Sequence, residues 1–263
     1  MKGEDGLARP ILDLQGVSKS YPNSQALEFL SVAIHSGERV ALAGPSGSGK
    51  TTLLYLMAGL LQPDRGELSI DGYSLAQLTP GKQLSRLVGL VHQQYDLVPH
   101  LPVVHNVLAG RLGQWSLLRS LASLVWPQER HLAETALAQM GIGDKINERT
   151  SHLSGGEQQR VAIARLIVQS PKVVLADEPV ASLDPALSEE MLGLLAELTS
   201  QANRTLVVSL HSPYLIKKYC SRVLGLREGR LMFDIPAAQL TEPVLDQLYN
   251  LKRHAWEAAA EVP

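Results

Sequence analysis

Cysteine is almost absent from this chain, and its scarcity bears on where the protein works. Among 263 residues the only cysteine is Cys220, so no disulfide can form within the chain. We expect a reducing compartment in which Cys220 is a small, buried, apolar side chain. The chain also has no run of about 20 apolar residues, the length needed to cross a bilayer. Residues 1–7 lack the apolar stretch of a signal peptide, so we expect any membrane-spanning segments to belong to other chains.

An excess of basic charge is missing as well. The 24 Lys and Arg residues are balanced by 26 Asp and Glu residues, which gives a formal net charge of −2. Binding to nucleic acid without regard to sequence needs a basic surface, so we expect no nucleic-acid partner. A nucleotide is not excluded, because a few backbone amides and one lysine hold phosphate groups locally.

Apolar runs rich in β-branched residues recur along the chain and predict buried strands. With 45% hydrophobic residues the chain has enough apolar surface for one large or two small α/β domains. Continuous apolar strands are typical of a parallel sheet that helices cover on both faces. The runs are residues 39–43, 172–176, 205–210 and 222–226. Between them lie helical patterns, the first of which has five apolar residues at helical spacing before residues 62–64 close it: Leu53, Leu56, Met57, Leu60 and Leu61.

Two other parts of the chain have different patterns. Residues 11–21, 28–35 and 67–71 predict antiparallel strands, joined by turns such as Pro22-Asn23 and Ser36-Gly37. Residues 94–159 are rich in leucine and poor in strands, so they predict a helical insertion. Within this insertion one helical face is apolar, and we expect it to form the insertion's core rather than a docking surface: Trp115, Leu118, Ala122, Val125 and Trp126. We expect a single domain over residues 1–251, with its core at 1–93 and 160–251, and a tail over 252–263.

Residues 44–52 fit the pattern G-x-x-x-x-G-K-[ST] of a phosphate-binding loop, between an apolar strand and an amphipathic helix. The loop consists of Gly44, Pro45, Ser46, Gly47, Ser48, Gly49, Lys50, Thr51 and Thr52. Glycines 47 and 49 allow the backbone to curl so that its amides point at phosphate oxygens, and the helix N-terminus adds a partial positive charge. Lys50 supplies a point charge for the β- and γ-phosphates, and the Thr51 hydroxyl is a ligand for Mg²⁺.

The alternative to this loop is a glycine-rich turn that binds nothing, but the flanking strand and helix favour a nucleotide site. We therefore expect an α/β fold with a P-loop NTPase core, in which a mostly parallel sheet is flanked by helices. An N-terminal antiparallel β subdomain and an inserted helical subdomain complete the expected architecture.

Two carboxylates follow the apolar run at 172–176. Asp177 and Glu178 stand at the carboxyl end of this strand, where ligands of open α/β sheets bind. Because successive side chains on a strand diverge, we expect the two acids to have different roles. We expect Asp177 to hold Mg²⁺ through water, and Glu178 to polarise the attacking water as general base. Two acids after a strand are usually only a solvated edge, but together with the lysine loop they favour catalysis.

The octet Leu-Ser-Gly-Gly-Glu-Gln-Gln-Arg at 153–160 is the most specific stretch in the chain. Ser154 with Glu157 three residues later predicts a capping box, at the start of a helix that runs to residue 169. A cap alone does not explain the two glycines and the polar tail. The octet resembles the signature motif of the ABC ATPases, and the resemblance extends from residue 12 to residue 249.

The resemblance implies a homodimer with ATP and Mg²⁺ at its interface. In this family the signature of one subunit covers the ATP that the P-loop of the other subunit holds. Ser154, Gly155 and Gly156 would then present a hydroxyl and helix N-terminal amides to a γ-phosphate. ATP binding would close the pair of subunits, and hydrolysis would release it.

Four further positions match the family pattern, although each is weak alone. Tyr21 matches an aromatic residue that stacks on adenine, and Gln93 matches a glutamine that reaches the metal and the attacking water. Asp184, in Ser-Leu-Asp at 182–184, matches a segment that crosses the dimer interface, although a simple helix cap is the alternative. His211 matches a histidine that contacts the γ-phosphate. With both Glu178 and His211 present, no catalytic element is missing, and a module that binds without hydrolysing is disfavoured.

Several stretches resemble the ATPase subunits of phosphonate importers: residues 106–121, 176–185, 233–241 and 248–249. This resemblance implies ATP-driven import of phosphonate or a related phosphorus oxyanion. It also implies integral membrane permease subunits, a periplasmic substrate-binding protein without direct contact, and a place on the cytoplasmic face of the inner membrane. The alternatives are another ABC importer, an exporter of the lipoprotein-release type, or a soluble ABC ATPase. The soluble ATPases usually have two cassettes, long coiled coils or a basic surface, which this sequence lacks.

Overall fold

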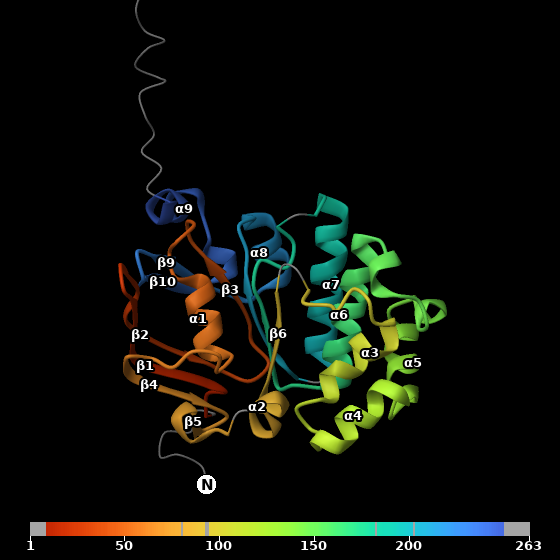
Figure 1. The fold of residues 1–263 in the computed structure, drawn as a ribbon. Coiled ribbons are helices and arrows are strands. Elements are labelled where there is room, and N and C mark those ends of the chain that lie inside the picture. Colours follow the sequence, from red (N-terminus) through yellow and green to blue (C-terminus); the bar gives the residue numbers. More distant parts are fainter. Residues whose placement is uncertain (1–8, 80, 93–94, 182, 202, 250–263) are drawn as a thin grey trace, which may run out of the picture.

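Two sheets and the helices around them form the molecule in the computed structural model, which describes residues 9–79, 81–92, 95–181, 183–201 and 203–249 (Figure 1). The larger sheet has the strand order β10-β9-β3-β8-β7-β6. Its strands are β3 (Arg39–Ala43), β6 (Val88–Val91), β7 (Val173–Ala176), β8 (Thr205–Ser209), β9 (Arg222–Arg227) and β10 (Arg230–Pro236). The strands from β9 to β6 are parallel, which confirms the four apolar runs as the centre of a parallel sheet. Only β10 is antiparallel, as the second arm of a hairpin with β9.

The smaller sheet is antiparallel, as the N-terminal pattern predicts. Its order is β2-β1-β4-β5, with β1 (Leu12–Tyr21), β2 (Ser24–Ile34), β4 (Arg65–Ile70) and β5 (Tyr73–Ser74). The predicted turns at residues 22–23 and 36–37 are present. The register between β1 and β2 shifts several times, and the bulges fall near Gly16, which has a φ of 60°.

Helices cover both faces of the parallel sheet. They are α1 (Lys50–Met57), α2 (Lys82–Leu87), α3 (Val103–Leu108), α4 (Leu117–Val125), α5 (Arg130–Gln139), α6 (Gly155–Gln169), α7 (Pro185–Gln201), α8 (Pro213–Tyr219) and α9 (Glu242–Tyr249). Short 3-10 turns lie at Leu75–Gln77, Ala109–Arg111, Gly143–Lys145, Thr150–His152 and Ala237–Gln239. In the part of the chain that the structure describes, none of these helices combines the length and apolar character needed to traverse a bilayer.

The side chains of β3 divide the interior into two cores. Val40 and Leu42 point to a core that α1 and the antiparallel sheet complete. Ala41 and Ala43 point to the opposite face, where helices α3, α5, α6 and α7 pack. This alternation explains why β3 is apolar at every position. It also places α1 and α6 on opposite faces of the sheet (Figure 1).

The stretch between β6 and β7 is helical in the described residues, as its composition predicts. Helices α3 and α5 pack on the first half of α6. The domain boundaries at 93, 159 and 251 stay predictions, because nothing in the arrangement of the elements tests them.

Two local predictions are wrong. The first helix ends at Met57 rather than before residue 62, because Gly59 has a φ of 69° and turns the chain away from the helix. Leu60 is consequently exposed. Most of the predicted apolar face of the insertion is not core either: Trp115 is partly buried against the core, but Leu118, Val125 and Trp126 are 80%, 87% and 76% exposed. Helical spacing shows that one side of a helix is apolar, but not what covers that side.

Candidate nucleotide site

The predicted phosphate-binding loop joins β3 to α1, and its Lys50 side chain is hydrogen-bonded to the backbone of the loop itself. The Lys50 ammonium donates hydrogen bonds to the carbonyl oxygens of Gly44 and Pro45, at 2.8 and 3.0 Å. The side chain is buried. Burial lowers the pKa of Lys50, while the charges of Glu178 and Asp177 act in the opposite direction.

The backbone of the loop leaves no room for a side chain at two of its three glycines, Gly44 and Gly49. A Cβ atom at Gly44 would overlap the carbonyl oxygen of Leu226 on β9, so this position accepts only glycine without a shift of the chain. Gly47, with a φ of 76°, has open space around its missing side chain. The buried hydroxyl of Ser48 has no hydrogen-bond partner among the described residues. An orphaned buried hydroxyl beside a buried ammonium fits an anionic ligand such as a phosphate chain.

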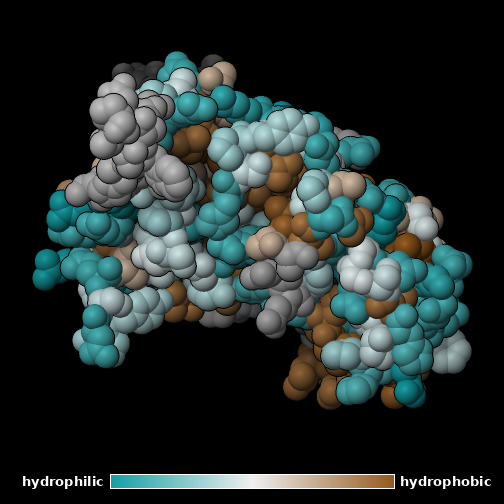
Figure 2. Space-filling view, turned by 90° about the horizontal axis from the view of Figure 1, so that it is seen from above, coloured by the Kyte–Doolittle hydropathy of each residue, from teal (hydrophilic) through white to brown (hydrophobic). Residues whose placement is uncertain are grey.

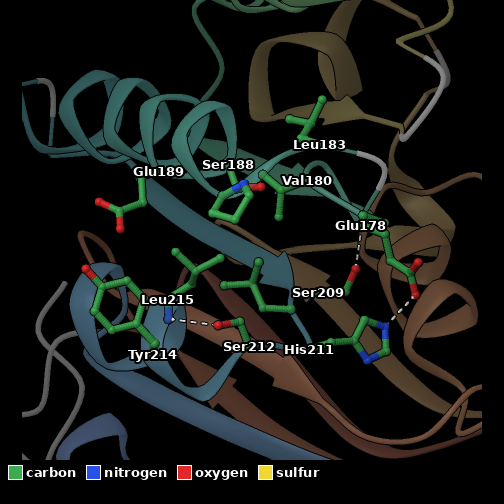
Figure 3. A pocket seen from close by; sticks show the side chains of 13 residues that line it. Glu178, Val180, Leu183, Ser188, Glu189, Ser209, His211, Ser212, Tyr214 and Leu215 are labelled. Carbon is green, nitrogen blue, oxygen red and sulfur yellow. Dashed lines mark hydrogen bonds and ion pairs between the residues drawn. The ribbon is translucent and has the colours of Figure 1, made fainter.

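Asp177 and Glu178 follow β7 directly, and the structure joins them to His211 after β8. The Nε2 atom of His211 lies 2.9 Å from Oε1 of Glu178 (Figure 3). Asp177 is buried, and its backbone amide continues the sheet by donating to the carbonyl of Val91. Glu178 and His211 meet because the parallel strands β7 and β8 end at the same edge of the sheet, a contact that the sequence analysis did not predict.

Ser209, the last residue of β8, links the two acids, and sequence analysis missed it. Its hydroxyl accepts a hydrogen bond from the backbone N–H of Glu178 at 2.6 Å and donates one to Oδ1 of Asp177 at 2.9 Å. The side chain is fully buried. A signal existed, because Ser209 is a polar residue at the end of an otherwise apolar buried strand.

A cavity of about 290 Å³ opens beside this group, between the chain that follows β7 and the start of α8. Glu178 and His211 lie at one end of it, and Glu189 and Tyr214 at the other (Figure 3). Between them the wall is mainly apolar. Glu178 and His211 therefore line a partly enclosed space rather than a flat surface.

The donors near the loop suit Mg²⁺ better than a transition metal. Asp177 offers a carboxylate and Thr51 an exposed hydroxyl, and both are hard oxygen ligands. Within the described residues, no group of three His, Cys, Asp or Glu side chains stands ready to hold a metal ion. Mg²⁺ that is bound to a nucleotide needs only one or two protein oxygens, since phosphates and water supply the rest. The residues present therefore fit that ion.

The predicted capping box starts α6. The Ser154 hydroxyl accepts from the backbone N–H of Glu157 at 3.3 Å, and a Glu157 carboxylate oxygen accepts from the N–H of Ser154 at 2.8 Å. Ser154 and Gly155 are exposed, and a Cβ at Gly155 would meet nothing within 4 Å. The tip of this helix is thus open to an approaching group. The Lys50 loop precedes α1 and Ser154 precedes α6, and these two helices lie on opposite faces of the sheet.

Tyr21 and Asp184 are two further residues that the sequence predicted for the site. Tyr21, at the end of β1, is 43% exposed, so it is not a core residue. Asp184 caps α7 by accepting from the backbone N–H of Leu187 at 3.0 Å, which is the structural alternative to an interface role. Gln93 and Ser182 lie outside the described residues.

The residues that flank Gln93 are anchored firmly. His92 packs edge-on against Tyr55 of α1, with ring centroids 5.6 Å apart, and its Nε2 lies 3.3 Å from a carboxylate oxygen of Asp96. Arg165 of α6 donates to the carbonyl of Tyr95 at 2.7 Å. This short connection therefore joins the core helix α1 to the helical insertion. The sequence alone did not explain His92, whereas its contacts with Tyr55 and Asp96 indicate a role in packing.

Comparison with known proteins identifies the family. The sequence family described as ABC transporter matches residues 27–181, more than half of the chain. A Pseudomonas putida protein named phosphonates import ATP-binding protein PhnC is 45% identical over 240 residues, covering 90% of this chain and 89% of that protein. A protein of the same name from Anaeromyxobacter dehalogenans is 48% identical over 253 residues, which are 95% of this chain, but this chain spans only about half (50%) of that relative's length.

Solved structures agree with this assignment. A dimeric ATP-binding cassette in a post-hydrolysis state, bound to ADP and Pi, is 30% identical with a TM-score of 0.73, covering 86% of this chain and 98% of that one. The ADP conformation of another ABC transporter cassette has a TM-score of 0.80 at 22% identity, covering 93% and 100%, and supports the fold alone. The expected P-loop NTPase core with its two subdomains is confirmed, and the chain belongs to the ABC transporter family as an ATP-binding cassette.

Proposed function

We propose that this chain is the ATP-hydrolysing subunit of an ABC transporter that imports phosphonate or a related phosphorus oxyanion. The observation that carries the ATPase assignment is the contact of Glu178 with His211, at 2.9 Å, at the same edge of the parallel sheet as the loop of the buried Lys50. The substrate assignment rests on relatives that are named phosphonates import ATP-binding proteins. Another ABC importer, or an exporter of the lipoprotein-release type, is the alternative.

The chain's own residues divide the work of hydrolysis. Lys50 and the amides of residues 44–52 bind the phosphates. Mg²⁺ would be held by the Thr51 hydroxyl and, through water, by Asp177, and it would neutralise the charge of the phosphates. Glu178 accepts the proton of the attacking water. His211 holds the Glu178 carboxylate through its Nε2 and would contact the γ-phosphate. Gln93 joins the metal and water site, and Tyr21 stacks on adenine.

A second copy of the chain completes the site. Ser154, Gly155 and Gly156 of the partner copy would direct a hydroxyl and the N-terminal amides of α6 at the γ-phosphate. The exposure of Ser154 and Gly155 supports this role, because an open helix tip is able to accept a ligand from outside the chain. Asp184 lies on the segment that crosses this interface. Closure of the two copies then depends on ATP, which couples hydrolysis to movement.

The exposed side of α4 supports a membrane partner. Six neighbouring apolar residues on this helix are between 55% and 87% exposed: Leu117, Leu118, Leu121, Leu124, Val125 and Trp126. Figure 2 shows apolar residues gathered at the edge of the helical subdomain, beside a hollow that separates it from the rest of the molecule. Monomeric soluble proteins rarely expose such a patch without a partner. We assign it to integral permease subunits, with the chain on the cytoplasmic face of the inner membrane.

A surface test separates this docking role from folding. Replacing Leu118 and Leu121 by serine removes apolar area but touches no residue of the nucleotide site. We expect co-purification with the permease to fall at least about tenfold, while the ATP affinity of the isolated chain is unchanged. Leu60→Ser is the control, since Leu60 is equally apolar and 58% exposed but lies outside the patch. Permease recovery that equals that of the control would contradict the assignment.

The function itself is tested on the reconstituted complex with its permease and periplasmic receptor. We expect ATP turnover to rise when phosphonates are supplied and to stay at the basal rate with sulfate. Stimulation by a different solute would move the assignment to another importer. A chain that hydrolyses ATP but recovers no integral membrane partner from native membranes would be a soluble ABC ATPase instead.

A further inference from the structure

The hydroxyl of Ser209 lies between the two acidic residues of the site and forms a hydrogen bond with each of them. It accepts the backbone N–H of Glu178 at 2.6 Å and donates to Oδ1 of Asp177 at 2.9 Å. Because the N–H of Glu178 can only donate, the hydroxyl must direct its own proton elsewhere, and Asp177 receives it. Asp177 therefore acts as the acceptor.

The parallel ladder between β7 and β8 explains how this bridge arises. Ala176 pairs with Val208, so the next positions along the two strands are Asp177 and Ser209. Glu178 has a φ of 46°, an unusual value for a residue with a side chain, so the chain turns sharply out of the sheet at this point. The Ser209 hydroxyl accepts a hydrogen bond from the N–H of Glu178 at the point where the chain leaves the sheet (Figure 3).

The two hydrogen bonds also act on each other. A hydroxyl that donates to a carboxylate becomes a better acceptor, so the bond to Asp177 strengthens the bond from Glu178. The bond to Asp177 fixes the rotation of the Asp177 carboxyl group. The bond from the N–H of Glu178 holds the backbone from which the Glu178 side chain reaches His211. One fully buried atom therefore sets the geometry of both acids.

We propose that Ser209 is a positioning residue that aligns the metal-holding Asp177 and the general base Glu178 as one unit. This inference rests on the proposed ATPase function of the same site. Residues that orient metal ligands through a hydrogen bond commonly change metal affinity or activity about 10- to 100-fold when they are replaced. Loss of the Ser209 hydroxyl should lower kcat and weaken the response to Mg²⁺. It should leave the phosphate-binding loop itself unaltered.

The test compares Ser209→Thr with Ser209→Val. The two new side chains have nearly the same shape, and both are compatible with a strand, but only threonine keeps the hydroxyl. In Ser209→Val we expect kcat to fall about 10- to 100-fold with an unchanged KM for MgATP, and we expect Ser209→Thr to restore most of the rate. The gain in ATP affinity that Mg²⁺ gives over EDTA should shrink by a similar factor in Ser209→Val, measured by equilibrium binding.

Thr199→Val is the control for loss of a buried hydroxyl. The Thr199 hydroxyl is also buried, but among the described residues it bonds only carbonyl groups of its own helix, those of Leu195 and Ala196. We expect it to leave kcat and the Mg²⁺ response unchanged. The inference is overturned if Ser209→Val keeps both wild-type properties, or if Ser209→Thr is as impaired as Ser209→Val. Failure of the proposed function looks different, because the wild-type chain would then show no ATP turnover, while the binding measurement would still report on Ser209.

Discussion

Replacing Glu178 by glutamine is the most direct test of the proposed base, because the structure separates its catalytic role from its structural one. The backbone N–H of Glu178 bonds Ser209, and its carbonyl accepts from Ala181 at 3.2 Å. Neither contact involves the side chain. The side chain is 34% exposed and has one described partner, His211, to which an amide also bonds. We therefore expect the free energy of unfolding to change by less than about 1 kcal/mol.

The effect on turnover should be far larger. A positioned general base typically contributes about 10²- to 10⁴-fold to a rate. At about 1.36 kcal/mol for each factor of ten, this range corresponds to roughly 2.7 to 5.4 kcal/mol in the activation free energy. An amide does not accept the proton of water, so Glu178→Gln should lose this amount while it still binds ATP. Because closure needs ATP but not hydrolysis, the variant should accumulate as a closed dimer.

The assay combines steady-state ATP turnover with the oligomeric state in MgATP, measured by sedimentation. Glu189→Gln is the matched control, since Glu189 lines the same cavity and undergoes the same chemical change, but pairs with Lys218 of α8 instead of His211 (Figure 3). The control should keep turnover within about twofold of the wild type. If Glu178→Gln retained a tenth or more of the wild-type rate, or if Glu189→Gln lost as much, Glu178 would not be the base.

Two further predictions concern the rest of the chain. The N–H of Ser154 and then its hydroxyl hold the pKa of Glu157 below its usual range, so its stabilising effect is present above the ordinary carboxyl pKa and is lost as the pH falls through the lowered value. Urea unfolding at about pH 7 and about pH 3 should therefore show a larger wild-type advantage over Glu157→Gln at the higher pH, and an advantage of equal size at both would contradict a stabilising role for the charge of Glu157. Burial raises the pKa of the Cys220 thiol to about 12, so the native chain should react with iodoacetamide far more slowly than the chain in urea; equal rates would show that Cys220 is not buried.

Local patterns predicted those features whose cause is itself local. The parallel strands follow from apolar runs such as that of β3, where Val40 and Ala41 face two different cores. The start of α6 follows from Ser154 and Glu157, because a capping box needs only four residues. The placement of Glu178 and His211 at one edge of the sheet also followed, since both come after apolar runs that predicted parallel strands, although their direct contact was not predicted. In each of these cases spacing along the chain determines the geometry.

The features that the sequence did not reveal depend on what stands across from a residue. Ser209 could be recognised as a polar residue ending a buried strand, but its bridge depends on the register between β7 and β8, which spacing does not give. The strand β10 was missed because its residues alternate between half-buried and exposed, so it lacks the apolar run that marked the central strands. Gly59 ends α1 through a backbone conformation that the apolar spacing of the following leucines concealed.

Helix α4 shows most clearly why an amphipathic pattern leaves the partner open. Its inward side is polar: Ser123 is buried and accepts from the N–H of Gln128, while Arg119 bonds Glu129 at 2.8 Å. The helix is thus held to the insertion by hydrogen bonds and an ion pair, which leaves its leucines free to contact another molecule. Each such side chain gains about 1.5 to 3 kcal/mol when it is fully buried. Burying even three of the six would therefore contribute several kilocalories per mole to the association with a partner, which is a physical reason for an apolar surface that folding alone does not explain.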